Sequence, residues 1–274
     1  MVAKALCIAL AIICAASAAP QNRITGGSDT DITEFPHIAA LVYYYPRIEL
    51  YIQRCVGPLI SSWHVLSSAY CFTGADLSNF VIRAGSSNSL IGGLETTMRG
   101  ILKHPDYVES PRQNDIALVF LQQPFGQSSV IRPLPLPPQD YVVPDGIAGV
   151  VAGWGFEMEG GIQHDTLKSV VLEKVSLDSC AAAYADEDQI DINERVICAA
   201  RESYGTCFGD AGAPMVAAVF NTPALIGISS YYKDCGSAEY PDVFTNIASY
   251  TDWIVENAVA PEQRFASDRP NIVY

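Results

Sequence analysis

The sequence predicts an all-β fold in two β-rich halves, followed by a C-terminal helix. Short runs of β-branched, aromatic and alternating apolar residues recur along the chain, and each run ends at Gly, Pro, Asn, Asp or Ser. The clearest runs are 37–45, 79–83, 115–121, 149–154, 215–220 and 224–232. Many short strands with regularly spaced turn residues are typical of a β-sandwich or β-barrel.

A proline-rich stretch divides these runs into two groups. Residues 132–145 read R-P-L-P-L-P-P-Q-D-Y-V-V-P-D, which cannot lie inside a sheet because proline has no N–H to donate. The chain has 274 residues, enough for one large β domain or two small ones, and its 49% hydrophobic content is ample for a packed core. We therefore expect a β-rich half on either side of this stretch.

Two segments have helical patterns. Residues 176–186 begin with capping residues and contain an alanine cluster, and residues 246–259 place an apolar stripe behind Asn246 as the cap. The stripe consists of Ile247, Tyr250, Ile254 and Ala258. We expect the second helix to pack as a terminal helix, and residues 260–274 to form a loosely ordered tail.

Residues 1–18 have the pattern of a signal peptide. Lys4 precedes an apolar run over 5–16, which closes on the small residues Ala16, Ser17 and Ala18. A membrane anchor is the alternative, but this run is shorter than the roughly 20 residues of a spanning helix. We therefore expect a secreted, extracellular protein that is not attached to a membrane.

The cysteine count agrees with an oxidising compartment. Two of the eight cysteines fall in the leader, and the six that remain form an even set that can pair in fifteen ways, among which spacing alone does not choose. A metal site is the alternative, and the absence of C-x-x-C or His-rich spacing argues against it. We expect disulfides, no metal and no cofactor.

The chain is strongly acidic. Its formal charge is −14, and loss of Lys4 and Arg23 with the leader leaves 14 basic against 30 acidic residues, or −16. This charge argues against nucleic acid or an anionic membrane as a partner. Two interpretations stay open, a cationic partner and simple solubility in a secretion.

Four segments, in order along the chain, resemble the chymotrypsin and trypsin family of serine proteases. They are R-I-T-G-G at 23–27, S-A-Y-C at 68–71, N-D-I-A-L at 114–118 and G-D-A-G-A-P at 209–214, and G-W-G at 153–155 also falls where the family has it. The resemblance covers essentially 24–259 and implies two six-stranded antiparallel β-barrels, at about 24–135 and 136–245, with a cleft between them. The disulfides that it implies are Cys55–Cys71, Cys180–Cys198 and Cys207–Cys235.

The catalytic positions that the resemblance implies have lost their reacting groups. Family chemistry needs a serine nucleophile, a histidine base and an aspartate that orients the histidine. The serine position is Ala211, whose methyl group cannot attack a carbonyl, and the histidine position is Tyr70, whose phenol is a poor proton acceptor near neutral pH. Asp115 matches the aspartate, and the amides of Gly209 and Ala211 match the oxyanion hole.

Other side chains offer no replacement for the catalytic pair. None of His37, His64, His104 and His164 matches a catalytic position. We expect the Tyr70 hydroxyl to donate a hydrogen bond to Asp115, since a buried carboxylate without a partner is costly.

The activation feature of the family is present in form. Cleavage after Arg23 would remove a propeptide at 19–23 and free the amino group of Ile24, which in the family pairs with an aspartate, here Asp210. One interpretation is a conformational switch that cleavage operates. The other is a processing step that is kept from ancestry for folding alone.

The specificity pocket of the family is altered here. The floor position is Gly205, a wall position that is usually glycine is Asp242, and Tyr232 stands where the family has an entrance glycine. Asp242 either recognises a basic side chain or is a capped loop residue behind a closed pocket. The tyrosines at 43–45 and 231–232 either form a recognition face or pack within strands.

The sequence therefore predicts a secreted, catalytically inactive serine protease homologue with a binding or regulatory role. We expect a monomer whose partner is a protein or peptide, such as a protease, an inhibitor or a secreted polypeptide. The short propeptide and the N-R-I-T-G-G junction resemble arthropod trypsin-like proteins. The alternatives are a family member with weak or repurposed proteolytic activity, and a structural or storage protein without a specific ligand.

Overall fold

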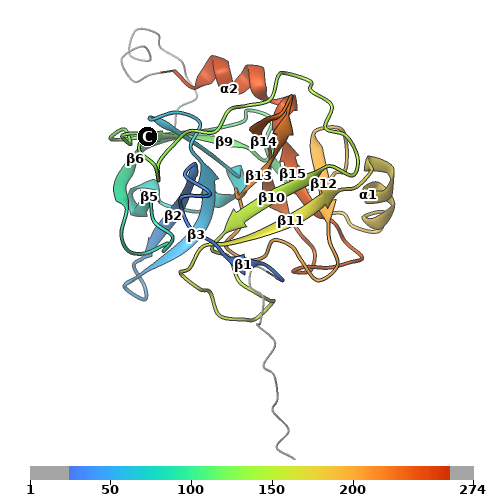
Figure 1. Cartoon of the computed structure of the whole chain (residues 1–274). Helices are drawn as coiled ribbons and strands as arrows, with labels where there is room; N and C mark the ends of the chain where they lie inside the picture. The colour runs from blue at the N-terminus through green and yellow to red at the C-terminus, as the bar shows by residue number, and fades with distance from the viewer. Residues whose placement is uncertain (1–24, 260–274) are drawn as a thin grey trace, which may run out of the picture.

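The computed structural model describes residues 25–259. The predicted leader and propeptide, the Arg23 cleavage site with Ile24, and the predicted tail at 260–274 lie outside these residues. The described chain forms two antiparallel β units side by side (Figure 1). Among the described residues, no helix is both long and apolar enough to cross a membrane.

The first unit is a six-stranded sheet with strand order β3-β2-β5-β6-β9-β4. Its strands are β2 (Ile38–Tyr45), β3 (Leu50–Pro58), β4 (His64–Ser67), β5 (Phe80–Ala84), β6 (Leu94–Lys103) and β9 (Ala117–Leu121). The sheet curls so that its two outer strands approach each other, where Leu59, directly after β3, forms a bridge with Val65 of β4.

The second unit is a closed barrel. Its sheet has the order β1-β11-β10-β13-β14-β15-β12, and a further pairing of β11 with β12 closes six of these strands on themselves. The strands are β1 (Ser28–Asp29), β10 (Ala148–Gly153), β11 (Lys168–Lys174), β12 (Val196–Ala200), β13 (Pro214–Val219), β14 (Thr222–Tyr231) and β15 (Asp242–Asn246). The all-β prediction and the two-unit architecture are thus confirmed, with the difference that β1, from the start of the chain, lies on the second unit beside β11.

The proline-rich stretch connects the two units without contributing a strand. Its backbone bonds to both of them, since Leu134 N–H donates to Leu59 O at 2.9 Å and Leu225 N–H donates to Pro135 O at 2.9 Å. The three disulfides join Cys55 to Cys71, Cys180 to Cys198, and Cys207 to Cys235, as the family resemblance implied.

The helices are short. Helix α1 (Leu177–Ala183) begins after Ser176, whose hydroxyl caps it by accepting from Ser179 N–H. The predicted second helix is divided into a 3₁₀ turn, η3 (Ile247–Ser249), and α2 (Thr251–Asn257). Asn246 occupies the N-cap position of η3, as expected, but its side chain donates to Glu194 O and makes no cap hydrogen bond.

The apolar stripe of this C-terminal segment packs where the two units meet. Ile247, Tyr250 and Ile254 are buried in a cluster that includes Leu66 from β4, and Ala258 packs against the same cluster. The prediction of a terminal helix that packs through this stripe is therefore confirmed.

Candidate active site

Pairing of β4 with β9 brings the first two site residues together. Ser67 at the end of β4 lies opposite Ala117 at the start of β9, so the residues after β4 lie beside the residues before β9. The chain after β4 turns into η1 (Ala69–Phe72), because the Ser68 hydroxyl caps it by accepting from Tyr70 N–H. Tyr70 therefore lies next to Asp115.

Asp115 is a buried carboxylate that is fully hydrogen-bonded. Its oxygens accept from the Ser68 hydroxyl at 2.7 and 2.8 Å, from the Tyr70 backbone N–H at 2.9 Å and from the Ser230 hydroxyl at 2.7 Å. Hydrogen bonds of this kind offset the cost of removing a charged group from water.

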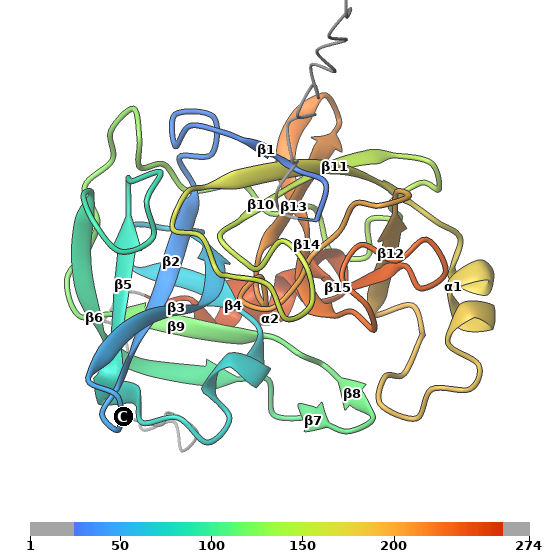
Figure 2. The same cartoon turned by 90° about the horizontal axis from the view of Figure 1, so that it is seen from below.

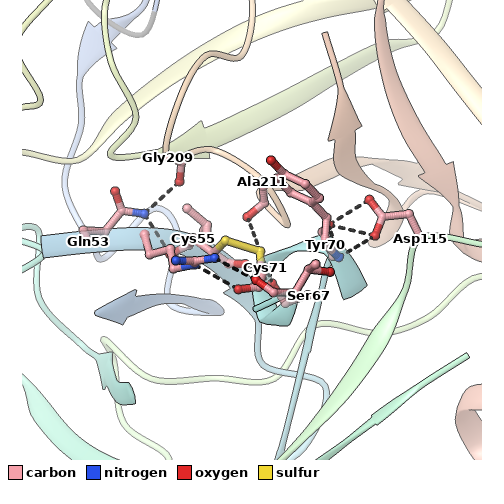
Figure 3. The surroundings of a disulfide bond; sticks show 12 residues. Gln53, Cys55, Ser67, Tyr70, Cys71, Asp115, Gly209 and Ala211 are labelled. Atoms are coloured by element: carbon pink, nitrogen blue, oxygen red, sulfur yellow. Dashed lines mark hydrogen bonds between the residues drawn. A yellow bond between two sulfur atoms is a disulfide. The ribbon is translucent and has the colours of Figure 1, made fainter. Parts of the chain in front are cut away.

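The Tyr70 ring does not make the contact with Asp115 that the sequence led us to expect. It points away from the carboxylate (Figure 3) and is 42% exposed. The Arg112 guanidinium lies over the ring, 4.1 Å from its centroid. The predicted bond from the Tyr70 hydroxyl is therefore wrong, because the Ser68 and Ser230 hydroxyls and the Tyr70 backbone already supply the donors.

The third position, Ala211, lies in the loop that leads into β13. Its carbonyl accepts from Val56 N–H at 2.9 Å, which ties the loop to β3. The loop depends on glycine at Gly212, which has φ +83° and whose added Cβ would lie 2.1 Å from the Val56 carbonyl oxygen. Gly209 also has a positive φ, and its carbonyl accepts from Gln53 Nε2 at 2.8 Å. Figure 3 shows Ala211 between Gly209 and Tyr70.

Three of the described histidines have structural surroundings, and the fourth, His164, pairs with Glu157 at 3.1 Å. Burial lowers the pKa of His37 to about 4. The His64 ring contacts the Ser61 hydroxyl at 2.7 Å and the Val259 carbonyl at 3.2 Å, and its side chain is buried. Burial also lowers the pKa of His104, which packs against the rings of Tyr250 and Trp253.

Asp210, the predicted activation residue, is fully buried. It accepts from Gly155 N–H at 2.8 Å and from Cys207 N–H at 3.1 Å, yet burial raises the pKa of its carboxyl to about 7. Its predicted partner, the amino group of Ile24, lies outside the described residues.

The predicted pocket residues lie together in a tightly packed region. Asp242 is 3% exposed and accepts from both the backbone N–H and the side chain of Thr206, and burial raises its pKa to about 7. A Cβ on Gly205 would lie 2.9 Å from an Asp242 oxygen. The Tyr232 ring is partly buried and packs edge-on against Phe208, with centroids 5.8 Å apart.

Three residues that build this site were not predicted from the sequence. Ser68 and Ser230 hold the Asp115 carboxylate, and Arg112 covers the Tyr70 ring. Ser68 stands beside Tyr70 in the S-A-Y-C segment, so its adjacency could have identified it. No sequence pattern identifies Arg112, which reaches the site from a separate hairpin. Among residues 25–259, no cluster of three or more His, Cys, Asp and Glu side chains is arranged to hold a metal ion.

Comparison with known proteins gives a consistent result. The family model described as Trypsin matches residues 24–254. Trypsin CFT-1 of Choristoneura fumiferana is 30% identical over 258 residues, covering 92% of this chain and 98% of that protein. A vitellin-degrading protease of Bombyx mori is 29% identical, and the match covers 93% of this chain and 94% of that protein. Trypsin eta of Drosophila melanogaster is 30% identical, and the match covers 89% of this chain and 92% of that protein.

Proposed function

The chain belongs to the trypsin family, and on that premise we propose that it is a secreted, catalytically inactive homologue that binds a protein or peptide partner. One observation carries the proposal. The side chains at the three triad positions are a methyl group at Ala211, an outward-facing phenol at Tyr70 and a carboxylate at Asp115 whose hydrogen bonds are already made. This arrangement supplies neither a nucleophile nor a base.

The size of the loss leaves little activity. In a protease with its triad removed, the triad accounted for about 10⁶ of the rate, and binding with oxyanion stabilisation left about 10³ to 10⁴ over water. A protein with Ala211 and Tyr70 at these positions retains at most the second of these contributions, the rate of about 10³ to 10⁴ over water.

Two nearby serines do not support a rearranged enzyme. Ser68 is bonded to the Asp115 carboxylate, but it is fully buried, so a peptide carbonyl cannot reach it. Ser61 contacts His64, but its hydroxyl also accepts from Trp63 N–H, and the His64 side chain is buried. A nucleophile must reach its substrate at near-attack geometry.

A binding role is supported by aromatic side chains that remain on the surface near the site. Phe208 is 55% exposed and Tyr70 is 42% exposed, and Phe208 is fixed by ring contacts with Phe156 and Tyr232. Fixed, exposed aromatic rings are frequent anchors of protein interfaces. Tyr43, by contrast, is buried and packs against the rings of Tyr45 and Phe80, so strand packing explains it.

Secretion and activation complete the proposal. Three disulfides form and persist in oxidising compartments, in agreement with the leader at 1–18. A buried Asp210 without a cationic partner is unfavourable, so an amino group freed by cleavage after Arg23 would stabilise the region around Asp210 and Gly155.

The test is peptidase activity on a mixed peptide library, with the protein cut after Arg23. We expect no turnover from the natural protein and turnover from an Ala211→Ser, Tyr70→His double variant. The matched control is Tyr70→His alone, which restores the base without a nucleophile and should be silent. A fluorophosphonate probe should label only the double variant. Turnover by the natural protein, purified free of contaminating protease, would refute the proposal.

A further inference from the structure

Arg112 bridges the two β units at the candidate site. It comes from a small hairpin, β7 (Val108–Glu109) and β8 (Arg112–Gln113), which lies between β6 and β9 in the chain and projects from the sheet (Figure 2). Its guanidinium lies 4.1 Å from the Tyr70 ring centroid and 5.6 Å from the Tyr231 ring centroid, and it donates to the Ser230 carbonyl. Tyr70 follows β4 of the first unit, and Tyr231 ends β14 of the second.

These neighbours are the groups that bind a guanidinium well. A planar, weakly hydrated cation is attracted to aromatic faces and donates in its own plane to a carbonyl oxygen. Two tyrosine rings and one carbonyl meet both requirements. The protein's formal charge of −14 adds a general attraction for a cation.

The walls of this site are held in place without Arg112. The Ser230 hydroxyl is bonded to Asp115, and the Tyr70 backbone is bonded to the same carboxylate. The Tyr231 hydroxyl donates to Glu187 at 3.2 Å, and Glu187 pairs with Lys233 at 2.8 Å. Removal of the Arg112 side chain therefore leaves the Tyr231 ring, the Ser230 carbonyl and the Tyr70 backbone where they are.

The backbone of Arg112 is fixed, but its side chain is not fully hydrogen-bonded. The Arg112 N–H donates to Gln189 O at 2.8 Å and the residue forms a bridge with Ile190, whereas the preceding hairpin residues 108–111 are exposed. Among the described residues, the Arg112 Nε atom is buried without a hydrogen-bond partner. An unsatisfied buried donor costs free energy, so the Arg112 side chain binds in this site less favourably than a guanidinium with all its donors bonded would.

We propose that Tyr70, Tyr231 and the Ser230 carbonyl form a guanidinium site, which Arg112 fills in the free protein and which an arginine side chain of the partner occupies in its place. The inference rests on the proposed binding function and names the chemistry of its ligand. The guanidinium site and the proposed function can fail independently of each other. If the site binds no arginine, the expected absence of peptidase activity is unaffected.

The first experiment opens the site with Arg112→Ala and titrates N-acetyl-arginine methylamide, followed by NMR. We expect this variant to bind the probe at least tenfold more tightly than the unaltered protein does. The uncharged citrulline analogue, which has nearly the same shape, should bind at least tenfold more weakly than the arginine probe. Adding Tyr70→Ala should abolish the gain.

Arg201→Ala is the matched control. Arg201 also lies 4.1 Å from a tyrosine ring centroid, that of Tyr204, but it is exposed and has one ring instead of two. This variant should gain no binding. Equal binding by Arg112→Ala, Arg201→Ala and the unaltered protein would overturn the proposal.

A second measurement needs no variant. In the unaltered protein, high concentrations of the arginine probe should shift the Nε–H resonance of Arg112, because the side chain is displaced, while the citrulline analogue should leave it in place. An Arg112 resonance that does not respond to the arginine probe would overturn the proposal even if Arg112→Ala fails to fold.

Discussion

Replacing Asp242 with asparagine should stabilise the protein at neutral pH and reduce the dependence of its stability on pH. The carboxyl is 3% exposed, accepts from Thr206 and lies near the charge of Asp210. Burial, the main cause, raises its pKa from 3.8 to about 7. Asparagine keeps an oxygen that can accept from Thr206 and removes the ionisable group.

The sign of the effect follows from proton binding. Between pH 4 and 7 the carboxyl of Asp242 is ionised in the unfolded chain and protonated in the folded one, so unfolding releases a proton and stability falls as pH rises. The stability that protonation of Asp242 contributes to the folded protein is fully present below about pH 4 and is lost above about pH 7. A shift of roughly three units at ~1.4 kcal/mol per unit makes the loss about 4 kcal/mol.

The assay is denaturant unfolding at several pH values between 4 and 8, with the disulfides intact. Asp242→Asn should unfold at a higher denaturant concentration than the unaltered protein at pH 8 and should show a shallower slope against pH. Some slope should remain, because Asp210 is also buried with a pKa of about 7. The exposed Asp186→Asn is the control and should change neither quantity. An unchanged slope, or a loss of stability at pH 8, would refute the reasoning.

Two further predictions concern the surroundings of Tyr70. Ser68→Ala should lower the free energy of unfolding by about 1.5–3 kcal/mol, because it removes a buried hydroxyl donor to the Asp115 carboxylate. The control is the exposed Ser78→Ala, which loses a hydroxyl bond to the Asp76 carboxylate and should change the free energy of unfolding by less than about 0.5 kcal/mol. Equal effects of the two substitutions in thermal melts would contradict this prediction. A Cys55→Ser, Cys71→Ser variant should lose about 3 kcal/mol, since the bridge closes a loop with a sequence separation of 16, and unchanged denaturant unfolding would contradict that estimate.

Much of the fold follows from local pattern. Period-two apolar runs and turn residues placed the strands, and the proline-rich stretch at 132–145 marked the connection between the units. Asn246 stands at the predicted N-cap position of the C-terminal segment, but its side chain bonds to the distant Glu194 carbonyl, and the segment is divided into η3 and α2. Local propensity does not contain such long-range contacts.

The candidate site, like the fold, was determined partly by the sequence and partly by the tertiary structure. The sequence by itself determined which atoms are present, a methyl group at Ala211 and a phenol at Tyr70, and family resemblance implied their positions. Only the tertiary structure decided where the Tyr70 ring points, that Ser68 and Ser230 hold Asp115, and that Arg112 covers the ring. The physical reason is that side-chain direction and burial depend on segments far apart in the chain, which meet only when both β units have formed.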